Sequence, residues 1–347
     1  MRSKFLNNDP LPWLCDGRDP SVAYLTAIHI MDVSKDSAEG RRLYDAVLHS
    51  DAVKKLLLHA RLGVMGDTRH FDIMPRGIMW SFAEAVTRGL DAREEVVTRT
   101  AAYIVENFQM EDGGFTLGWT PRVSAGCRTG DMICYLLQSE MDDDRIEDGI
   151  RWILQHQRHD GGWLHCPVAG TCDMFRFFMT RRSGKGLRYE DDHGVASCVY
   201  ATSACCRALM QYKETESTKD GLQRAAEFLL KHGLFFQGNA VTGIRHLCGQ
   251  NDQFDLPGVP VLSQYDTIDG LHIMAHTGYM KDSRCTEAFN DVMRRQNSNG
   301  TWNLGRAKTG MLTHGRAGSK QKGLPDRWVT MRILKVLKKA GELEIDN

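Results

Sequence analysis

The segment QRHDGGW, residues 157–163, decides the fold, because QMEDGGF at residues 109–115 and QNSNGTW at residues 296–302 resemble it. Each segment follows a stretch whose apolar residues recur every three or four positions, as on one face of a helix. The glycines end that helix, because glycine readily adopts the left-handed conformation of a helix C-cap. We therefore interpret the three segments as copies of one repeat, in which a helix ends at a glycine turn followed by an aromatic residue.

Helices of a second kind lie between the repeats. Residues 194–206, GVASCVYATSACC, include no charged side chain, and a helix without a polar face is buried on all sides. Similar charge-poor helices are expected to start near Ser21, Pro75, Gly130, Tyr265 and Asp326. Buried helices that alternate with amphipathic ones are typical of a toroid. The sequence thus predicts an all-α fold, an (α/α)6 toroid of inner and outer helices that forms a single domain over residues 1–347.

Composition narrows the class of partner. The chain has 44 Lys+Arg and 44 Asp+Glu, so its formal net charge is zero and electrostatics favour neither nucleic acid nor an anionic membrane. No apolar run approaches the roughly 18 residues that span a bilayer, and the first 20 residues lack the apolar core of a secretory signal. Ten cysteines without an export signal are typical of a reducing compartment. We expect a cytoplasmic protein with a small-molecule substrate and without a membrane span, whose oligomeric state the sequence does not give.

The repeats resemble the QW-type motifs of the terpenoid cyclase and protein prenyltransferase superfamily, in which a helix leads into glutamine, Gly-Gly or Gly-Thr, and an aromatic residue. The resemblance implies a pocket at the N-terminal ends of the inner helices, lined by the long connections that enter them. Class II cyclases of this family protonate an alkene with an aspartic acid in a DxDD-T motif. In the corresponding place this chain has residues 263–267, SQYDT, which agree with the motif only in the final Asp-Thr pair.

Acid–base residues are expected where the connections enter the inner helices. Asp266 and His193 each stand at the start of a charge-poor helix, and a carboxylate beside His193 would raise the pKa of its imidazole. We predict that they form an acid–base pair. Three further catalytic candidates lie at similar positions: Asp192, Tyr265 and Asp131. The alternative for Asp266 is an ordinary N-cap, whose side chain accepts hydrogen bonds from backbone N–H groups.

Substrate-binding candidates lie in the same connections. Arginines near helix N-termini favour anionic groups on a ligand, and an aromatic residue supplies an apolar wall. The predicted set is Arg76, Arg128, Arg176, Phe178, His70 and Asp269.

Cysteine and histidine in these connections also allow a metal centre. Thiolate and imidazole ligands suit zinc, which accepts them together in a tetrahedron. The candidate ligands, for zinc or iron, are Cys166, Cys172, Cys248, His246 and Cys127. The alternative is that these cysteines are small buried packing residues.

Taken with the resemblance, these residues favour an enzyme that carries out lyase, isomerase or transferase chemistry on a small organic, isoprenoid-like substrate. One alternative is a metal-dependent enzyme that uses the cysteine and histidine ligands. Another is a non-catalytic toroid that binds a ligand or a partner. Titratable residues that converge on one pocket favour catalysis.

Overall fold

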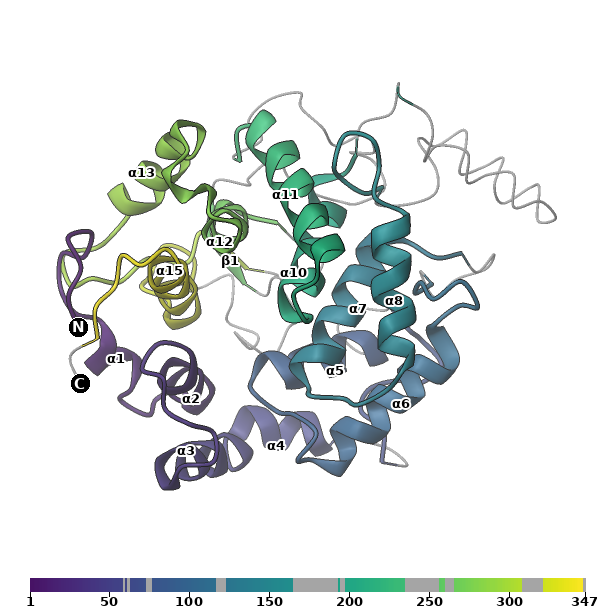
Figure 1. Ribbon diagram of the computed structural model, residues 1–347. Helices are drawn as coiled ribbons and strands as arrows, with labels where there is room; N and C mark the ends of the chain where they lie inside the picture. The colour runs from purple at the N-terminus through teal and green to yellow at the C-terminus, as the bar shows by residue number, and fades with distance from the viewer. Residues whose placement is uncertain are drawn as a thin grey trace.

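In the computed structural model, the regular secondary structure of the described residues is almost entirely helical (Figure 1). The structure describes residues 1–58, 60, 63–72, 77–116, 123–164, 193, 197–234, 256–259, 265–307 and 321–345. Apart from isolated bridges, the β-structure within these residues is one parallel pair of two-residue strands, β1 (Gly258–Val259) and β2 (Arg306–Ala307). The predicted all-α class is therefore confirmed.

Six helices correspond to the six charge-poor segments of the sequence. They are α2 (Pro20–His29), α5 (Ile78–Thr87), α7 (Gly126–Gln138), α10 (Val199–Gln211), α12 (Thr267–Thr277) and α15 (Arg327–Lys339). In α5, every residue from Ile78 to Val86 is buried, and in α10 so is every residue from Val199 to Cys206. The absence of charge from residues 199–206 of α10 thus reflects burial on every face of that part of the helix.

These six helices contact one another in chain order. α5 packs on α7, α7 on α10, α10 on α12, α12 on α15, and α15 on α2 (Figure 1). The turn after α5 reaches α2, where Arg93 Nη2 donates a hydrogen bond to Tyr24 Oη at 2.9 Å. Two backbone hydrogen bonds between Arg2 and Glu344 join the two ends of the chain. This order of contacts is the one that a ring of inner helices requires.

The amphipathic helices pack against this set from outside. They are α3 (Ala38–Leu48), α4 (Asp51–Leu58), α6 (Glu95–Phe108), α8 (Arg145–Gln155), α11 (Glu216–Lys231) and α13 (Thr286–Arg294). α3 contacts α2, α6 contacts α5, α8 contacts α7, α11 contacts α10 and α13 contacts α12. Short helical segments complete the described chain: α1 (Leu11–Leu14) and two 3₁₀ turns at Tyr279–Lys281 and Ser283–Cys285.

The three repeat segments share one local structure. In the first two, the glutamine amide bridges two backbone carbonyls: Gln109 Nε2 donates to Gly113 and to Arg145, and Gln157 Nε2 donates to Gly161 and to Gly221. The second carbonyl of each pair belongs to the next outer helix, α8 or α11. Each glutamine therefore fastens the end of one outer helix to the next outer helix along the chain.

The aromatic residue of each repeat fastens the turn to an inner helix. The backbone N–H groups of Phe115, Trp163 and Trp302 donate to threonine hydroxyls at 2.9–3.1 Å. The acceptors are Thr129 on α7, Thr202 on α10 and Thr330 on α15. All three threonines are buried, so the repeat also explains these buried hydroxyl groups.

A prediction concerns Gly161, which has a φ of +89° and lies so close to α11 that a Cβ atom would stand 2.3 Å from the Arg224 carbonyl oxygen. Gly233 is a matched control, because its φ is +70° and a Cβ atom would meet nothing within 4 Å. Gly233→Ala should cost only the left-handed backbone strain, roughly 1–2 kcal/mol. Gly161→Ala should lower the free energy of unfolding further, because the α11 backbone must shift. Urea denaturation of both variants tests this, and equal losses would contradict the close approach.

Candidate active site in a central cavity

A cavity of about 330 Å³ lies between the inner helices, and all six contribute to its wall. It is lined by the last turns of α2, α5, α7 and α10 and by the first half of α12 and of α15. Its polar wall consists mainly of Asp269, Arg207, Arg332, Lys335, His272, Gln138, Lys35, Asp91 and Glu140. The pocket expected at the N-terminal ends of the inner helices would be lined by connections that lie largely outside the described residues.

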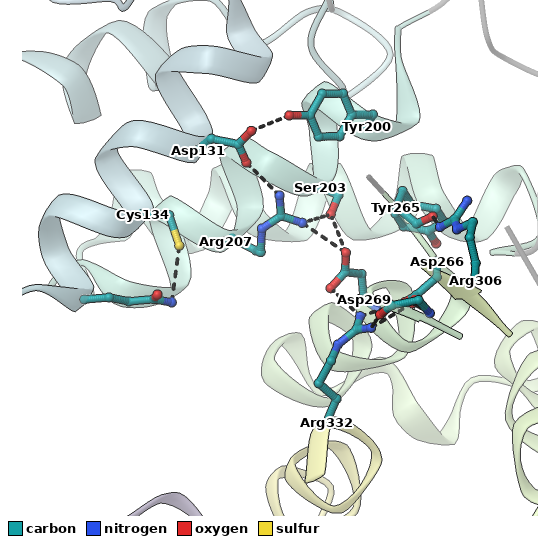
Figure 2. A network of polar contacts seen from close by, with 12 residues as sticks. Asp131, Cys134, Tyr200, Ser203, Arg207, Tyr265, Asp266, Asp269, Arg306 and Arg332 are labelled. Atoms are coloured by element: carbon teal, nitrogen blue, oxygen red, sulfur yellow. Dashed lines mark hydrogen bonds and ion pairs between the residues drawn. The ribbon is translucent and has the colours of Figure 1, made fainter. Parts of the chain in front are cut away.

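A chain of buried ion pairs crosses one side of this cavity (Figure 2). Arg207 Nη2 donates to Asp131 Oδ1 at 2.9 Å, and Arg207 Nη1 donates to Asp269 Oδ2 at 3.0 Å. Arg332 Nη2 then donates to Asp269 Oδ1 at 3.1 Å and to Asp266 Oδ1 at 2.7 Å. Carboxylates and guanidiniums thus alternate from α7 through α10 and α12 to α15.

The chain continues past Asp131 toward α5. Tyr200 donates its hydroxyl hydrogen to Asp131 Oδ2, and Arg128 Nη1 lies 3.9 Å from the same oxygen. Arg128 Nη2 also donates to Asp72, whose other oxygen accepts from Trp80 Nε1 at 2.9 Å. The charge of Arg128, a predicted substrate-binding residue, is thus neutralised by two carboxylates of the protein. Asp131, a predicted catalytic residue, is fully buried and is not part of the cavity wall.

Asp266 caps α12. Its Oδ1 accepts from the Asp269 N–H at 3.1 Å and its Oδ2 accepts from the Gly258 N–H at 2.8 Å. Both oxygens also accept from Arg332. Burial raises the pKa of Asp266, but Arg332, Arg306 and the backbone donors outweigh it, so the pKa lies below its ordinary value. The N-cap alternative drawn from the sequence therefore describes the position of Asp266, and its charge holds Arg332 in place.

Asp269 differs from Asp266 in both exposure and pKa. It forms part of the cavity wall, while its neighbour Asp266 does not. Burial raises the pKa of the Asp269 carboxyl, and the negative charge of Asp266 acts in the same direction, so that the nearby Arg207 and Arg332 do not offset the rise. Asp269 shares both guanidiniums with other carboxylates, since Arg207 also binds Asp131 and Arg332 also binds Asp266. Sequence analysis predicted Asp269 as a substrate-binding residue; the structure places it in the cavity wall, and substrate binding stays a prediction.

The remaining wall of the cavity is largely apolar. Leu25 and Ile28 of α2, Met210 of α10, and Trp328 and Met331 of α15 contribute to it. His272 lies on α12 beside this surface, and burial lowers its pKa to about 3, so its imidazole is neutral at neutral pH. His29 of α2 also lies in the wall, and burial lowers its pKa to about 3 as well. The cavity therefore combines the buried carboxyl groups of Asp91 and Asp269, two neutral imidazoles and an apolar surface.

Other predicted residues lie elsewhere. His193 is exposed and stacks on the exposed His159, with ring centroids 3.8 Å apart, so the structure does not bring it into contact with Asp266. Tyr265 is buried beneath α12 and donates its hydroxyl hydrogen to the Leu234 carbonyl at 2.9 Å. His70 is exposed, and its Nδ1 lies 3.1 Å from Asp67 Oδ2. None of the three forms part of the cavity wall. Asp192, Arg76, Arg176 and Phe178 lie outside the described residues.

Sequence reasoning missed Arg207, Arg332, His272 and Lys335 as site residues. Each lies in the interior of an inner helix rather than in a connection. The available signal was a charged or titratable side chain inside an otherwise apolar helical segment. Arg207, for example, directly follows the uncharged run that ends at Cys206. A charge at such a position has to be paired or has to face a cavity.

The predicted metal centre lies mostly outside the described part of the chain, which includes neither Cys166, Cys172, Cys248 nor His246. Cys127 is described and is fully buried in the first turn of α7. Within the described residues, no group of three or more His, Cys, Asp or Glu side chains could hold a metal ion. Zinc or iron binding therefore stays a prediction.

Metal analysis of the purified protein tests that prediction. If the cysteines are ligands, the protein should contain about one zinc or iron ion per chain, and the double variant Cys166→Ser, Cys172→Ser should lose it. Cys285→Ser is a suitable control, because Cys285 is a buried thiol outside the predicted ligand set. A folded protein without metal, in which all ten thiols titrate, would count against the centre.

A second prediction concerns the ion pairs. Asp266→Ala leaves Arg332 with a single carboxylate and removes a cap, so it should lower the free energy of unfolding by about 3–5 kcal/mol. Asp282 is the matched control, since it caps a 3₁₀ turn and pairs with Arg284 but is more exposed. Asp282→Ala should cost only about 0.5–2 kcal/mol.

The same pair of variants has a pH signature. The pKa of Asp266 is lowered in the folded protein, so its stabilisation is complete above the unfolded pKa of about 3.9 and is lost as the pH falls through the folded value. The stability difference between wild type and Asp266→Ala, measured by denaturant titration, should therefore shrink below about pH 3.9. If the stability difference between wild type and Asp266→Ala did not change with pH even in acid, the result would contradict the ion pair.

Comparison with known proteins adds little. No family model matches the chain, and no curated protein matches it. Among solved structures, the chain is similar to a type II terpene cyclase variant, MstE from Scytonema, in complex with its substrate geranylgeranyl dihydroxybenzoate. The match covers 84% of this chain and 96% of that one, with 11% identity and a TM-score of 0.32. Similarity at this level assigns neither a fold nor a reaction. The chain's own residues define an all-α protein with a cavity between its inner helices, and no described helix is long and apolar enough to cross a membrane.

Proposed function

We propose that the protein is an enzyme that acts on a small organic substrate in the central cavity, by acid-catalysed lyase, isomerase or transferase chemistry with Asp269 as the proton donor. The observation that supports this most directly is a carboxyl group of raised pKa in the wall of a cavity that all six inner helices surround. A carboxyl group of raised pKa keeps its proton to a higher pH than an ordinary aspartate and is therefore suited to act as a proton donor. Perturbed carboxyl groups in clefts are typical of catalytic sites.

The neighbours of Asp269 support this role. Arg207 and Arg332 bind one carboxyl oxygen each, at 3.0 and 3.1 Å, and hold the group in a fixed orientation. Once the proton has left, the same two guanidiniums stabilise the carboxylate that forms. In this proposal Asp266 is a positioning residue that acts through Arg332, and it neither donates a proton to the substrate nor accepts one from it.

The cavity also offers a proton acceptor. His272 has a pKa of about 3, so it is a weak base that stays neutral at neutral pH. A weak base suffices where the departing proton comes from a strongly acidic cationic intermediate. Tyr24, Tyr135 and Trp328 lie in the cavity wall, and aromatic faces stabilise positive charge. These groups together favour a reaction that begins with protonation and ends with loss of a proton.

A substrate-independent test examines the acid itself. Infrared titration of the purified protein should show a protonated-carboxyl band that persists at pH values above the ordinary pKa range of aspartate. That band should be missing from Asp269→Asn and unchanged in Asp282→Asn, a surface carboxylate paired with Arg284. If no such band disappears in Asp269→Asn, Asp269 is an ordinary carboxylate and the proposed acid is wrong.

A test of catalysis uses a panel of small alkenes, epoxides and prenyl compounds incubated with the protein in D₂O. Mass spectrometry should detect a product that contains solvent deuterium, because the first step is protonation. Asp269→Asn should lower its rate of formation by about 10²–10⁴-fold, the usual contribution of a general acid, while Asp282→Asn should not. If Asp269→Asn forms the product at the wild-type rate, the result would favour the metal-dependent alternative. If the wild-type protein forms no product, the result would favour the non-catalytic binding toroid.

A further inference from the structure

Lys335 differs from the other basic side chains in the cavity wall. Arg207 and Arg332 bind aspartates, and Lys35 pairs with Glu140 and Asp91. Lys335 projects from the middle of α15, is partly buried and forms part of the same wall. Among the contacts of the described residues, it has neither a hydrogen bond nor an ion pair. Within the described part of the chain, the Lys335 ammonium in the cavity wall is therefore not neutralised by a carboxylate.

The groups that face Lys335 do not compensate its charge. Arg332 lies one turn earlier on α15, His272 faces it from α12, Cys134 from α7 and His29 from α2. None of these four is a carboxylate. Asp269, a carboxyl group of the same wall, is bound by Arg207 and Arg332. Burial lowers the pKa of the Lys335 ammonium, and the positive charge of Arg332 acts in the same direction.

We propose that Lys335 binds a single carboxylate group of the substrate, whose apolar body lies against Ile28, Met210 and Met331. This inference rests on the proposed function, because the cavity is the same, and it names the class of substrate: a carboxylic acid with an apolar chain or ring. Placing an anion beside an unpaired, partly buried ammonium gives it a charge-assisted partner.

The number and placement of the charges favour a carboxylate over a diphosphate. A diphosphate has several negative charges and normally requires several cations or a metal ion. The described wall has one uncompensated ammonium, since its arginines are bound to aspartates. A cavity of about 330 Å³ is at the small end for organic ligands, which suits a chain or ring of modest size.

The carboxylate would also support the acid. A negative charge in the cavity disfavours ionisation of Asp269, so the bound substrate raises the pKa of that carboxyl group further. The substrate would thus be anchored at Lys335 and would itself help to keep the proton donor protonated.

Isothermal titration of the full-length protein with octanoate tests the proposal, and octanamide serves as the uncharged probe of the same size. Octanoate should bind more tightly than octanamide. Lys335→Met should weaken octanoate binding by about 10- to 100-fold, the range for a hydrogen bond to a charged group, and should leave octanamide binding unchanged. Lys335→Arg should keep most of the affinity. Lys339→Met is the matched control, because Lys339 is an exposed lysine of the same helix.

Three results would overturn the inference: equal binding of octanoate and octanamide, no binding of either, or tighter Lys335-dependent binding of geranyl diphosphate than of octanoate. Circular dichroism verifies that Lys335→Met is folded, and Lys335→Arg keeps the test decisive if it is not. Binding requires no turnover, so the outcome of this experiment is independent of the outcome of the catalytic tests. Octanoate binding that depends on Lys335 in a protein without a protonated Asp269 would support the anchor and reject the acid.

Discussion

The ion-pair chain that runs from Asp131 through Arg207, Asp269 and Arg332 to Asp266 is the interaction on which the cavity depends. It joins α7, α10, α12 and α15, and its members are largely or completely buried. A buried guanidinium that loses its carboxylate is left as an uncompensated charge, which is far more costly than a lost surface ion pair. Any sliding of one inner helix along its neighbour would break at least one link. The chain therefore fixes the axial positions of four of the helices that surround the cavity.

The repeats supply a complementary constraint, because they link neighbouring helices at their ends. A glutamine such as Gln157 links one outer helix to the next, while the aromatic N–H that follows links the turn to a threonine on an inner helix. These bonds use backbone groups that the end of a helix would otherwise leave without partners. Hydrogen bonds at the helix ends and ion pairs at the helix centres thus leave the space between the inner helices as a defined cavity.

Much of this architecture could be predicted from the sequence, because burial on every face leaves a direct trace in composition. The uncharged run at residues 194–206 indicated α10, and the glycine turns indicated where α6, α8 and α13 end. Helix starts were less accurate: α7 begins at Gly126, before the expected Gly130. Local hydrogen bonds that set a helix start depend on tertiary neighbours, which no helical periodicity encodes.

The site was harder to predict for a related reason. Sequence analysis weighed Asp266 as an acid and as a cap, and the cap geometry follows from local spacing. What distinguishes Asp269 from Asp266 is that Asp269 binds both Arg207 and Arg332. Each of these arginines lies more than 60 residues from Asp269 in the chain. A single sequence does not reveal such pairings. His193 and Asp266 resembled each other as residues that precede charge-poor helices, yet only one of them is buried.

Sharing of arginines also distinguishes Asp269, the proposed proton donor, from the other carboxylates of the ion-pair chain. Asp131 accepts from Tyr200 and Arg207, with Arg128 close by, and Asp266 accepts from Arg332 and from two backbone N–H groups. Asp269 has no guanidinium of its own, because both of its arginines also bind another aspartate. Of Asp266 and Asp269, the carboxyl group that accepts from two backbone N–H groups, Asp266, has the lower pKa. The ion-pair chain that stabilises the helices thus also includes, in the wall of the cavity, a carboxyl group whose pKa is raised by burial.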